Sequence, residues 1–221
     1  MESYLKEWEE DYKKRVREIT LFTDESKNLS QDQKVKLIRL FYHARGHFSR
    51  FLWIMASYAP SMKYRAIVLR NITDELGGID PSHLSHEQLF FEFAEFFDKD
   101  IHEEVSNETS YFPFLRAFDQ GHIQKLLEAS FNEKWAIFAA YELLDNTDYN
   151  NLYRLAKNIG TPEEGLTFFD VHRTGDHFRD TFVLLQEIWN KNQQTVKDSF
   201  DFIGNHQLAM WRGINDEVYG K

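Results

Sequence analysis

Residues 30–60, with the sequence SQDQKVKLIRLFYHARGHFSRFLWIMASYAP, decide the fold class of this chain. Apolar side chains recur in this stretch at intervals of three and four residues, which is the spacing of one face of an α-helix. This apolar stripe consists of Leu37, Leu40, Phe41, Ala44, Phe48, Phe51, Leu52 and Met55. Ser30 and Gln33 have the spacing of a capping box, and Pro60 cannot continue a helix. The stretch therefore predicts a long amphipathic helix between Ser30 and Pro60.

The same helical period extends from this stretch in both directions. Further helices are expected over about 2–22, 61–76, 131–145, 148–159 and most of 162–217, from Asp80 or Ser85 to about 104, and as short pieces before residue 130. Glycine and proline are sparse (10 and 4 of 221 residues), and no segment has the alternation of a strand. We therefore predict an all-α fold, a compact bundle of about seven helices in a single domain over residues 1–221.

Composition restricts the class of function. The net charge is −10, and the absence of a basic stripe argues against a nucleic-acid partner. The sequence has no apolar run long enough for a membrane span and no cysteine, which excludes disulfides, thiolate metal ligands and cysteine nucleophiles. The N-terminus begins a charged amphipathic segment and lacks the pattern of a signal peptide, so a cytoplasmic protein is expected.

Ionisable residues interrupt the apolar face of the late helical segment. At about 100° per residue, Asp176 lies about 40° from His172, and Arg179 lies about 20° away on the other side. Phe168 and Phe169 flank the same face. The phase therefore predicts that His172, Asp176 and Arg179 project together from a face framed by aromatic rings.

Three other ionisable residues lie on apolar stripes of other helices. Glu75 and Glu142 follow Val68 and Trp135 by two helical turns, and His86 begins the stripe of its own helix. Burying unpaired carboxylates is costly, so inward acids and histidines favour a bound cation. Nitrogen and oxygen ligands suit iron or manganese, and carboxylates from several helices build di-iron sites. A buried ion-pair network, with Arg179 as its cation, is the alternative.

These segments resemble the haem-oxygenase-like di-iron oxidases, a family that includes CADD-like proteins and proteins called iron-containing redox enzymes. The resemblance covers about residues 35–185. It is carried by Asn71-Ile72-Thr73-Asp74-Glu75-Leu76-Gly77, by His86-Glu87-Gln88-Leu89-Phe90, by Tyr141-Glu142 and by Phe168-Phe169-Asp170-Val171-His172 with Asp176.

The resemblance implies a seven-helix haem-oxygenase-like bundle that holds two irons and activates dioxygen, and the variant position Arg179 leaves one or two irons as the expectation. It assigns the metal ligands to Glu75, His86, Glu142, His172 and Asp176, with His83 as a weaker candidate for the place of His86. The family pattern has a further histidine where this chain has Arg179. Because arginine cannot bind a metal, Arg179 is expected to enter the acidic pocket and pair with a carboxylate there. Tyr141 and His47 are also expected at the pocket.

Other functions are compatible with the same fold. The thiaminase type requires a cysteine nucleophile, whereas pyrroloquinoline-quinone synthases need no metal. A haem oxygenase would need a histidine on an early helix, where His43 and His47 lie, but inward acids do not suit a haem pocket. The alternative is a metal-free module that binds a small molecule or, through the acidic face of its first helix, another protein. For an enzyme, the expected partners are dioxygen, an apolar or aromatic small molecule and a second copy in a homodimer.

Overall fold

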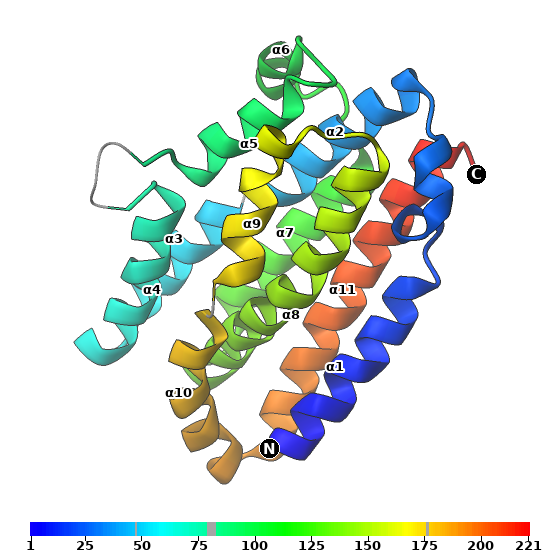
Figure 1. The fold of residues 1–221 in the computed structure, drawn as a ribbon. Coiled ribbons are helices and arrows are strands. Elements are labelled where there is room, and N and C mark those ends of the chain that lie inside the picture. Colours follow the sequence, from blue (N-terminus) through cyan, green and yellow to red (C-terminus); the bar gives the residue numbers. More distant parts are fainter. Residues whose placement is uncertain (47, 79–82, 176) are drawn as a thin grey trace.

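The structure, a computed structural model, describes residues 1–46, 48–78, 83–175 and 177–221, with only the backbone described for His177. These residues form helices and loops, and none of them lies in a strand (Figure 1). The α-helices are α1 (Glu2–Arg17), α2 (Gln31–Arg45), α3 (Phe48–Tyr58), α4 (Met62–Glu75), α5 (His86–Ala94), α6 (Ile101–Asn107), α7 (Pro113–Glu128), α8 (Phe131–Asn158), α9 (Thr167–Thr174), α10 (His177–Lys191) and α11 (Gln193–Tyr219). Short 3-10 helices are η1 (Thr20–Phe22), η2 (Asp24–Asn28) and η3 (Glu163–Leu166). The all-α prediction is confirmed, with more helices than the seven expected.

Serine capping boxes begin three of the helices. The predicted box at α2 is present, because the backbone N–H of Gln33 donates to Ser30 Oγ at 3.3 Å and the N–H of Ser30 donates to Gln33 Oε1 at 2.9 Å. Equivalent boxes begin α5 at Ser85 and α8 at Ser130. Each box satisfies backbone donors that a helix start would otherwise leave unpaired. The start of these helices is therefore encoded locally.

Several breaks between helices differ from the prediction. The long helix expected between Ser30 and Pro60 is divided, since α2 ends at Arg45 and α3 begins at Phe48. Conversely, α8 is one helix of 28 residues where two were expected. Gly204 lies inside α11 rather than ending it. Apolar periodicity reports which face of a helix is buried, but it does not report where the axis bends or continues.

A break at Gly175 has the largest consequence. The prediction treated the chain after residue 162 as almost continuous helix, whereas α9 ends at Thr174 and α10 begins at His177. Gly175 between them is extended, with φ −67° and ψ 139°. The rotation of 100° per residue therefore cannot be carried from His172 to Arg179, since the two residues belong to different helices.

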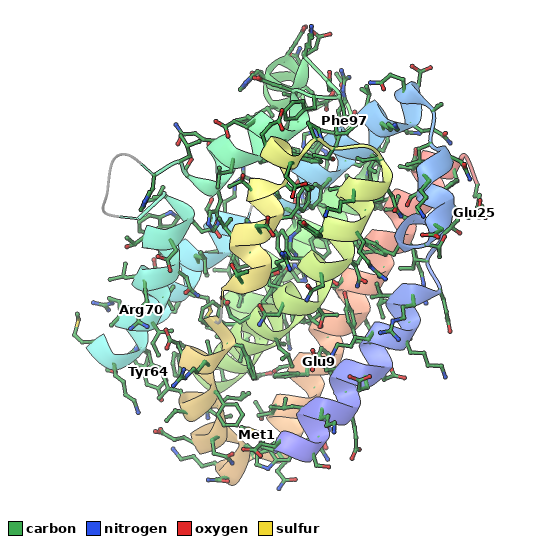
Figure 2. All side chains as sticks on the ribbon, viewed as in Figure 1. Met1, Glu9, Glu25, Tyr64, Arg70 and Phe97 are labelled. Carbon is green, nitrogen blue, oxygen red and sulfur yellow. The ribbon has the colours of Figure 1, made fainter. Side chains whose placement is uncertain are left out.

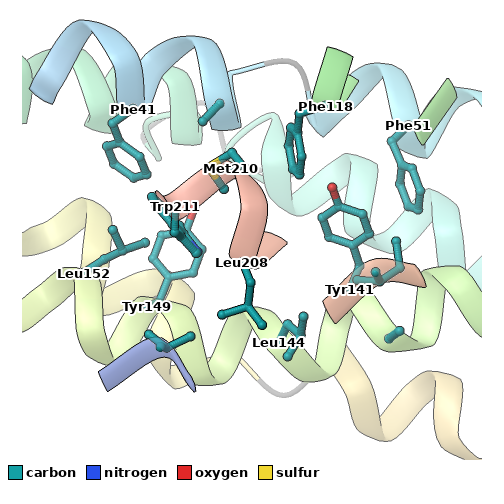
Figure 3. Close-up of a cluster of buried hydrophobic side chains, with 14 of the residues drawn as sticks. Phe41, Phe51, Phe118, Tyr141, Leu144, Tyr149, Leu152, Leu208, Met210 and Trp211 are labelled. Atoms are coloured by element: carbon teal, nitrogen blue, oxygen red, sulfur yellow. The ribbon is translucent and has the colours of Figure 1, made fainter. Parts of the chain in front are cut away.

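The core surrounds α8. This helix packs against α11, α10 and α9, and Trp135 and Phe138 on it are completely buried. Figure 3 shows side chains from α2, α8 and α11 that fill the centre of the bundle, among them Phe41, Leu152 and Leu208. The outer surface carries charged residues such as Glu25 and Arg70 (Figure 2). Within the described part of the chain, no helix is both long and apolar enough for a bilayer span.

Candidate metal centre

Three side chains with metal-binding groups meet where α4, α5 and α9 approach one another. Glu75 is the last residue of α4, His86 is the first residue of α5, and His172 lies in α9. Each offers one ligand atom, and these three atoms all lie within 4.8 Å of one another. His86 Nδ1 is 3.0 Å from Glu75 Oε1, and the rings of His86 and His172 have centroids 4.2 Å apart. The structure thus brings together three of the five predicted ligands.

The turn after α4 positions Glu75 and His86. Gly77 has φ +89°, a backbone conformation that favours glycine. A Cβ at Gly77 would lie 2.7 Å from the backbone oxygen of His83, so the close return of the chain also requires glycine. Ser85 then caps α5 and places His86 in its first turn.

A backbone hydrogen bond orients the His172 ring. Its Nδ1 lies 2.7 Å from the carbonyl oxygen of Phe168, and a carbonyl oxygen only accepts, so Nδ1 donates. The lone pair of the neutral ring is therefore on Nε2, the arrangement typical of histidines that bind metals. The Tyr149 ring stacks on the His172 ring, with centroids 4.0 Å apart and planes 10° from parallel.

Glu142 adds a buried carboxylate to this region. Asn71 Nδ2 donates to Glu142 Oε1 at 2.8 Å, and Glu142 lines a small cavity together with Glu75, His86 and His172. Burial raises the pKa of Glu142 well above its ordinary value, and the nearby charges of Asp145 and Glu75 raise it further. A bound cation would relieve this unfavourable concentration of negative charge, so the donor set fits a metal.

Four other predicted residues have different outcomes. Asp176 and His47 lie outside the described residues. His83 is exposed, whereas His86 is half-buried, which favours His86 as the ligand. Arg179 is exposed on α10 and, in the structure as described, lines neither cavity beside these ligands. This position corrects the expectation of a buried Arg179, and the break at Gly175 is its physical reason.

Tyr141 is also placed differently from the prediction. It is buried, but its hydroxyl lies 2.7 Å from His122 Nδ1. It lines a neighbouring cavity with Phe51 and Asp119, and it is not among the residues described around Glu75 and His172. Tyr141 and Glu142 are adjacent in sequence but point to different cavities, because successive helical residues are rotated by about 100°.

Sequence reasoning missed an ion pair at the site. Arg45 Nη2 of α2 contacts Asp145 Oδ1 of α8, and their side chains are only 7% and 17% exposed. The Arg45 guanidinium also lies 5.2 Å from the ring centroid of Tyr149. Arg45 is therefore a cation that faces one of these acids, Asp145. Its spacing of four residues from Phe41 placed it on the apolar stripe, which was a usable signal.

An aromatic cavity of about 160 Å³ adjoins the three ligand candidates. Glu75, His86 and His172 form part of its wall. Its other lining residues include Phe41, Tyr42, Arg45, Phe48, Phe90, Asp145, Tyr149 and Phe168. A small molecule in this cavity would lie against the candidate ligands.

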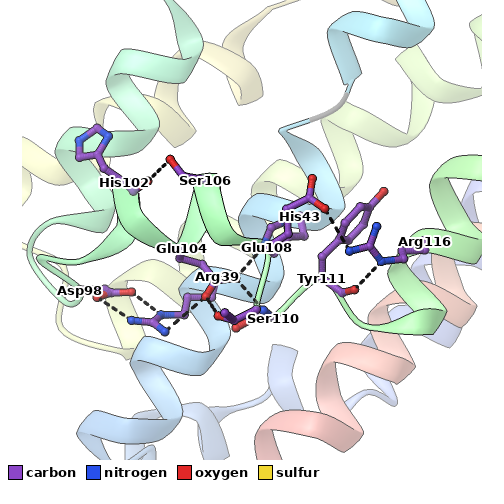
Figure 4. A network of polar contacts seen from close by, with 11 residues as sticks. Arg39, His43, Asp98, His102, Glu104, Ser106, Glu108, Ser110, Tyr111 and Arg116 are labelled. Atoms are coloured by element: carbon purple, nitrogen blue, oxygen red, sulfur yellow. Dashed lines mark hydrogen bonds and ion pairs between the residues drawn. The ribbon is translucent and has the colours of Figure 1, made fainter.

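The early histidine considered for haem or metal has a different environment. His43 is buried, and its Nε2 lies 2.9 Å from Glu104 Oε1 (Figure 4). Glu104 also contacts Arg39, which forms a two-point ion pair with Asp98. This network joins α2 to α6 and the segment before it, and His43 lines none of the cavities described here. His43 is a hydrogen-bonded core histidine.

Comparisons with known proteins bear on the family and on the fold. Residues 35–178 match the model of a family described as iron-containing redox enzyme. A crystal structure of a CADD-like protein of unknown function from Nostoc punctiforme PCC 73102 has a TM-score of 0.72 at 11% sequence identity, over 99% of this chain and 97% of that one. A second structure of that protein has a TM-score of 0.71 at 11% identity, over 98% and 99%. No curated protein matches the sequence significantly.

Proposed function

The chain belongs to the iron-containing redox enzyme family, and from this premise we propose that it is a non-haem iron oxidase or oxygenase. Its substrates would be dioxygen and a small apolar or aromatic molecule, and residues 1–221 would act as one helical domain. The observation that carries the proposal is the convergence of Glu75, His86 and His172, whose ligand atoms lie within 4.8 Å of one another.

The chemistry of these donors fits iron. Two imidazoles and one carboxylate form the ligand set typical of non-haem iron(II) oxygenases. Glu75, His86 and His172 would hold the metal, and Glu142 in the same small cavity offers a further carboxylate. When bound there, iron would supply the one-electron chemistry by which dioxygen reacts with organic molecules. The finer part of the proposal, one iron or two, depends on Asp176 as well.

The chain's own residues would orient these ligands. The carbonyl oxygen of Phe168 accepts from Nδ1 of His172, so Nε2 is the ring nitrogen that would bind a cation, and Asn71 holds one oxygen of Glu142. Such outer hydrogen bonds fix ligand geometry and contribute to metal affinity. The ligands would therefore be in position before the metal arrives.

The aromatic cavity supports a small substrate. Its volume of about 160 Å³ is close to that of an apolar cavity of about 150 Å³ that binds benzene. Its rings would exclude water from an apolar ligand and hold it against Glu75, His86 and His172. We therefore propose a molecule with one ring or a short chain. A cytoplasmic location and a homodimer stay predictions.

Metal analysis of protein expressed with added iron tests the proposal. The wild type should retain iron and consume dioxygen, and His172→Ala should lose both properties. His102→Ala is the matched control, because His102 also lies beside a glutamate, Glu95, at 3.3 Å, but is exposed. If the wild type binds no more iron than His172→Ala, the metal-free binding module becomes the better proposal.

A further inference from the structure

A buried carboxylate in α8 accepts hydrogen bonds from two side chains that are easily oxidised. Tyr12 Oη donates to Asp148 Oδ1 at 2.9 Å, and Trp211 Nε1 donates to Asp148 Oδ2 at 3.0 Å. All three residues are buried, and they join α1, α8 and α11. Phenol and indole are the protein groups that lose one electron most readily after thiols, and this chain has no cysteine. Tyr12 and Trp211 can therefore be oxidised by one electron beside a carboxylate that can accept their protons.

A third such side chain continues this arrangement to the surface. The rings of Trp8 and Tyr12 are stacked, with centroids 6.0 Å apart and planes 12° from parallel. Trp8 Nε1 donates to Asp201 Oδ1 at 3.1 Å, and Trp8 is half-buried beside a small surface depression. A Cβ at Gly204 would lie 2.8 Å from the Trp8 ring, so a glycine allows the indole to lie against α11. Trp8, Tyr12 and Trp211 thus each donate to a carboxylate.

Aromatic contacts connect the inner end of this group to the metal centre. The Trp211 ring centroid lies 6.3 Å from that of Phe41, and Phe41 lies 6.0 Å from Phe168. Phe168 in turn lies 4.7 Å from the ring of His172. Figure 3 shows Phe41 and Trp211 in the same part of the core. Packed rings therefore extend from His172 to Trp211, and the Asp148 carboxylate connects Trp211 to Tyr12 and its stacked neighbour Trp8.

We propose that Trp211, Tyr12 and Trp8 form a hole-transfer chain that carries oxidising equivalents from the metal centre to the surface between α1 and α11. The inference rests on the proposed function, because the oxidant at the inner end is the metal centre after its reaction with dioxygen. This hole-transfer chain would remove oxidising equivalents from the metal centre when no substrate occupies the aromatic cavity. It would thereby protect Glu75, His86 and His172 from oxidation.

Each transfer is balanced by a proton that moves to a named carboxylate. In the first step, Trp211 loses one electron to the oxidised centre, which is reduced by one electron. The Nε1–H bond of Trp211 breaks, an O–H bond forms on Asp148, and a neutral indolyl radical remains. Burial raises the pKa of Asp148 to about 6, which makes this carboxylate a better proton acceptor than one in water while it is still ionised at neutral pH.

The following steps return the earlier members to their initial state. Tyr12 gives an electron to the Trp211 radical, Asp148 returns its proton to Trp211, and the Tyr12 hydroxyl proton moves to Asp148. Trp8 then gives an electron to the Tyr12 radical, which recovers its proton from Asp148, while the Nε1 proton of Trp8 moves to Asp201. The radical ends on Trp8, where an external reductant can reach it.

Light-driven oxidation tests the hole-transfer chain without iron at the candidate metal centre. Because the protein has no cysteine, Leu76→Cys offers one thiol for a ruthenium polypyridyl photo-oxidant at an exposed position beside the aromatic cavity. After a flash with a soluble electron acceptor, the absorption of indolyl and phenoxyl radicals should appear, and Trp211→Phe should abolish the part that forms at Tyr12 and Trp8. Trp135→Phe is the control, since Trp135 is equally buried but donates to the carbonyl oxygen of Thr181, which cannot take a proton.

Asp201→Asn tests the proton step at the surface, where the substitution leaves the core intact. The Trp8 radical should then keep its proton and show the spectrum of the radical cation. The proposal is overturned if wild type and Trp211→Phe give the same radicals, or if Trp135→Phe has the larger effect. Rapid-freeze electron paramagnetic resonance of the iron-loaded protein with dioxygen tests the proposed function separately. A positive flash result with no iron-dependent radical would support the chain and refute the oxidase.

Discussion

Two histidine–glutamate pairs in this protein have nearly the same contact distance but different surroundings. His43 Nε2 lies 2.9 Å from Glu104, and His86 Nδ1 lies 3.0 Å from Glu75. The side chains of the first pair are both 1% exposed, whereas those of the second are 16% and 23% exposed beside a cavity. The contact distance alone therefore does not identify a metal site. The two pairs differ in whether a cavity adjoins them and in how many hydrogen bonds the glutamate oxygens accept from the protein.

The Glu104 carboxylate is already satisfied by protein donors. It accepts from the backbone N–H of Ser110, from the Thr109 hydroxyl and from Arg39 in addition to its contact with His43 (Figure 4). Burial opposes the ionisation of Glu104, but hydrogen bonds from Thr109, His43 and Ser110 outweigh it and lower its pKa. Near the other pair, Asn71 donates to Glu142 and Arg45 pairs with Asp145, but burial and the charges of Asp145 and Glu75 still raise the pKa of Glu142. The first pair stabilises the fold, and the second fits a cation.

The largest expected effect is a loss of folding stability when the His43–Glu104 pair is broken. Glu104→Ala leaves the buried His43 and the Arg39 guanidinium without this carboxylate, so the free energy of unfolding should fall by about 3–5 kcal/mol. Urea unfolding measures the change, and Glu103→Ala, at an exposed neighbour in α6, is the control. The iron content of the folded fraction should not change. A loss comparable to that of the control would remove the distinction between the two pairs.

The corresponding change in the second pair should act on metal rather than on folding. Glu75→Ala should weaken iron binding by about 100-fold or more, because loss of even an outer-shell partner costs about 10–100-fold. The free energy of unfolding without metal should change by less than about 1 kcal/mol, since a partly exposed pair contributes little. Iron titration and urea unfolding of the same samples test this, with Glu95→Ala as control. Equal iron affinity in Glu75→Ala and wild type would contradict the assignment.

Glu142→Gln should have opposite effects with and without metal. Burial and the charges of Asp145 and Glu75 raise the pKa of Glu142, so its ionised form destabilises the metal-free fold at neutral pH. The variant should therefore be more stable than wild type without iron and should gain less stability when iron is added. Its advantage should grow as pH rises above 4.5, the ordinary pKa of glutamate, because the unfolded wild type then loses its proton before the folded one does. Thermal unfolding measures both effects: the higher stability of the variant without iron and its smaller gain in stability with iron.

The pH dependence of Glu104 should have the reverse sign. Its pKa is lowered in the folded protein from an ordinary value of 4.5, so the stability that its ionised form contributes is present above that pH. The contribution is lost as pH falls through the lowered folded pKa. The stability difference between wild type and Glu104→Gln should therefore be constant near neutral pH and decrease in acid. A difference that increases on acidification would show that Glu104 is protonated in the fold.

The smallest effect is expected at Arg179. Because its side chain is exposed, Arg179→Ala should change the free energy of unfolding by less than about 1 kcal/mol, the usual contribution of exposed ion pairs. Arg45→Ala is the comparison, and it should cost more because it removes a largely buried cation from its ion pair with the half-buried Asp145. Similar values for the two variants would mean that Arg179 also has a buried role.

Local patterns were sufficient for several features of the site. Glu75 and Glu142 were found because each follows a buried residue by two helical turns, and both line the same small cavity. The Ser30 capping box and the glycine stop after α4 were also correct. These features depend on residues within a few positions of one another, where hydrogen bonding and helical rotation are determined by the sequence itself.

The outcome at Arg179 shows where this local reasoning fails. The angle from His172 to Arg179 holds only if one helix contains both, and the extended backbone at Gly175 separates α9 from α10. A glycine is compatible with either a continuous helix or a break, because its backbone has more allowed conformations than other residues. The position of Arg179 therefore depends on how α10 packs, which no pattern within residues 172–179 specifies.

By itself, the sequence determined the helical class, the start of α2 at its capping box and many of the residues that face inward, because these properties follow from short-range hydrogen bonds and helical periodicity. Only the tertiary structure decided which inward residues meet. Arg45 and Asp145 are 100 residues apart in sequence, and they meet only because the fold brings the C-terminal end of α2 close to α8. Likewise, Glu75, His86 and His172 form one group only because α4, α5 and α9 converge. Such long-range contacts depend on how all the helices pack together, and no single helix encodes them.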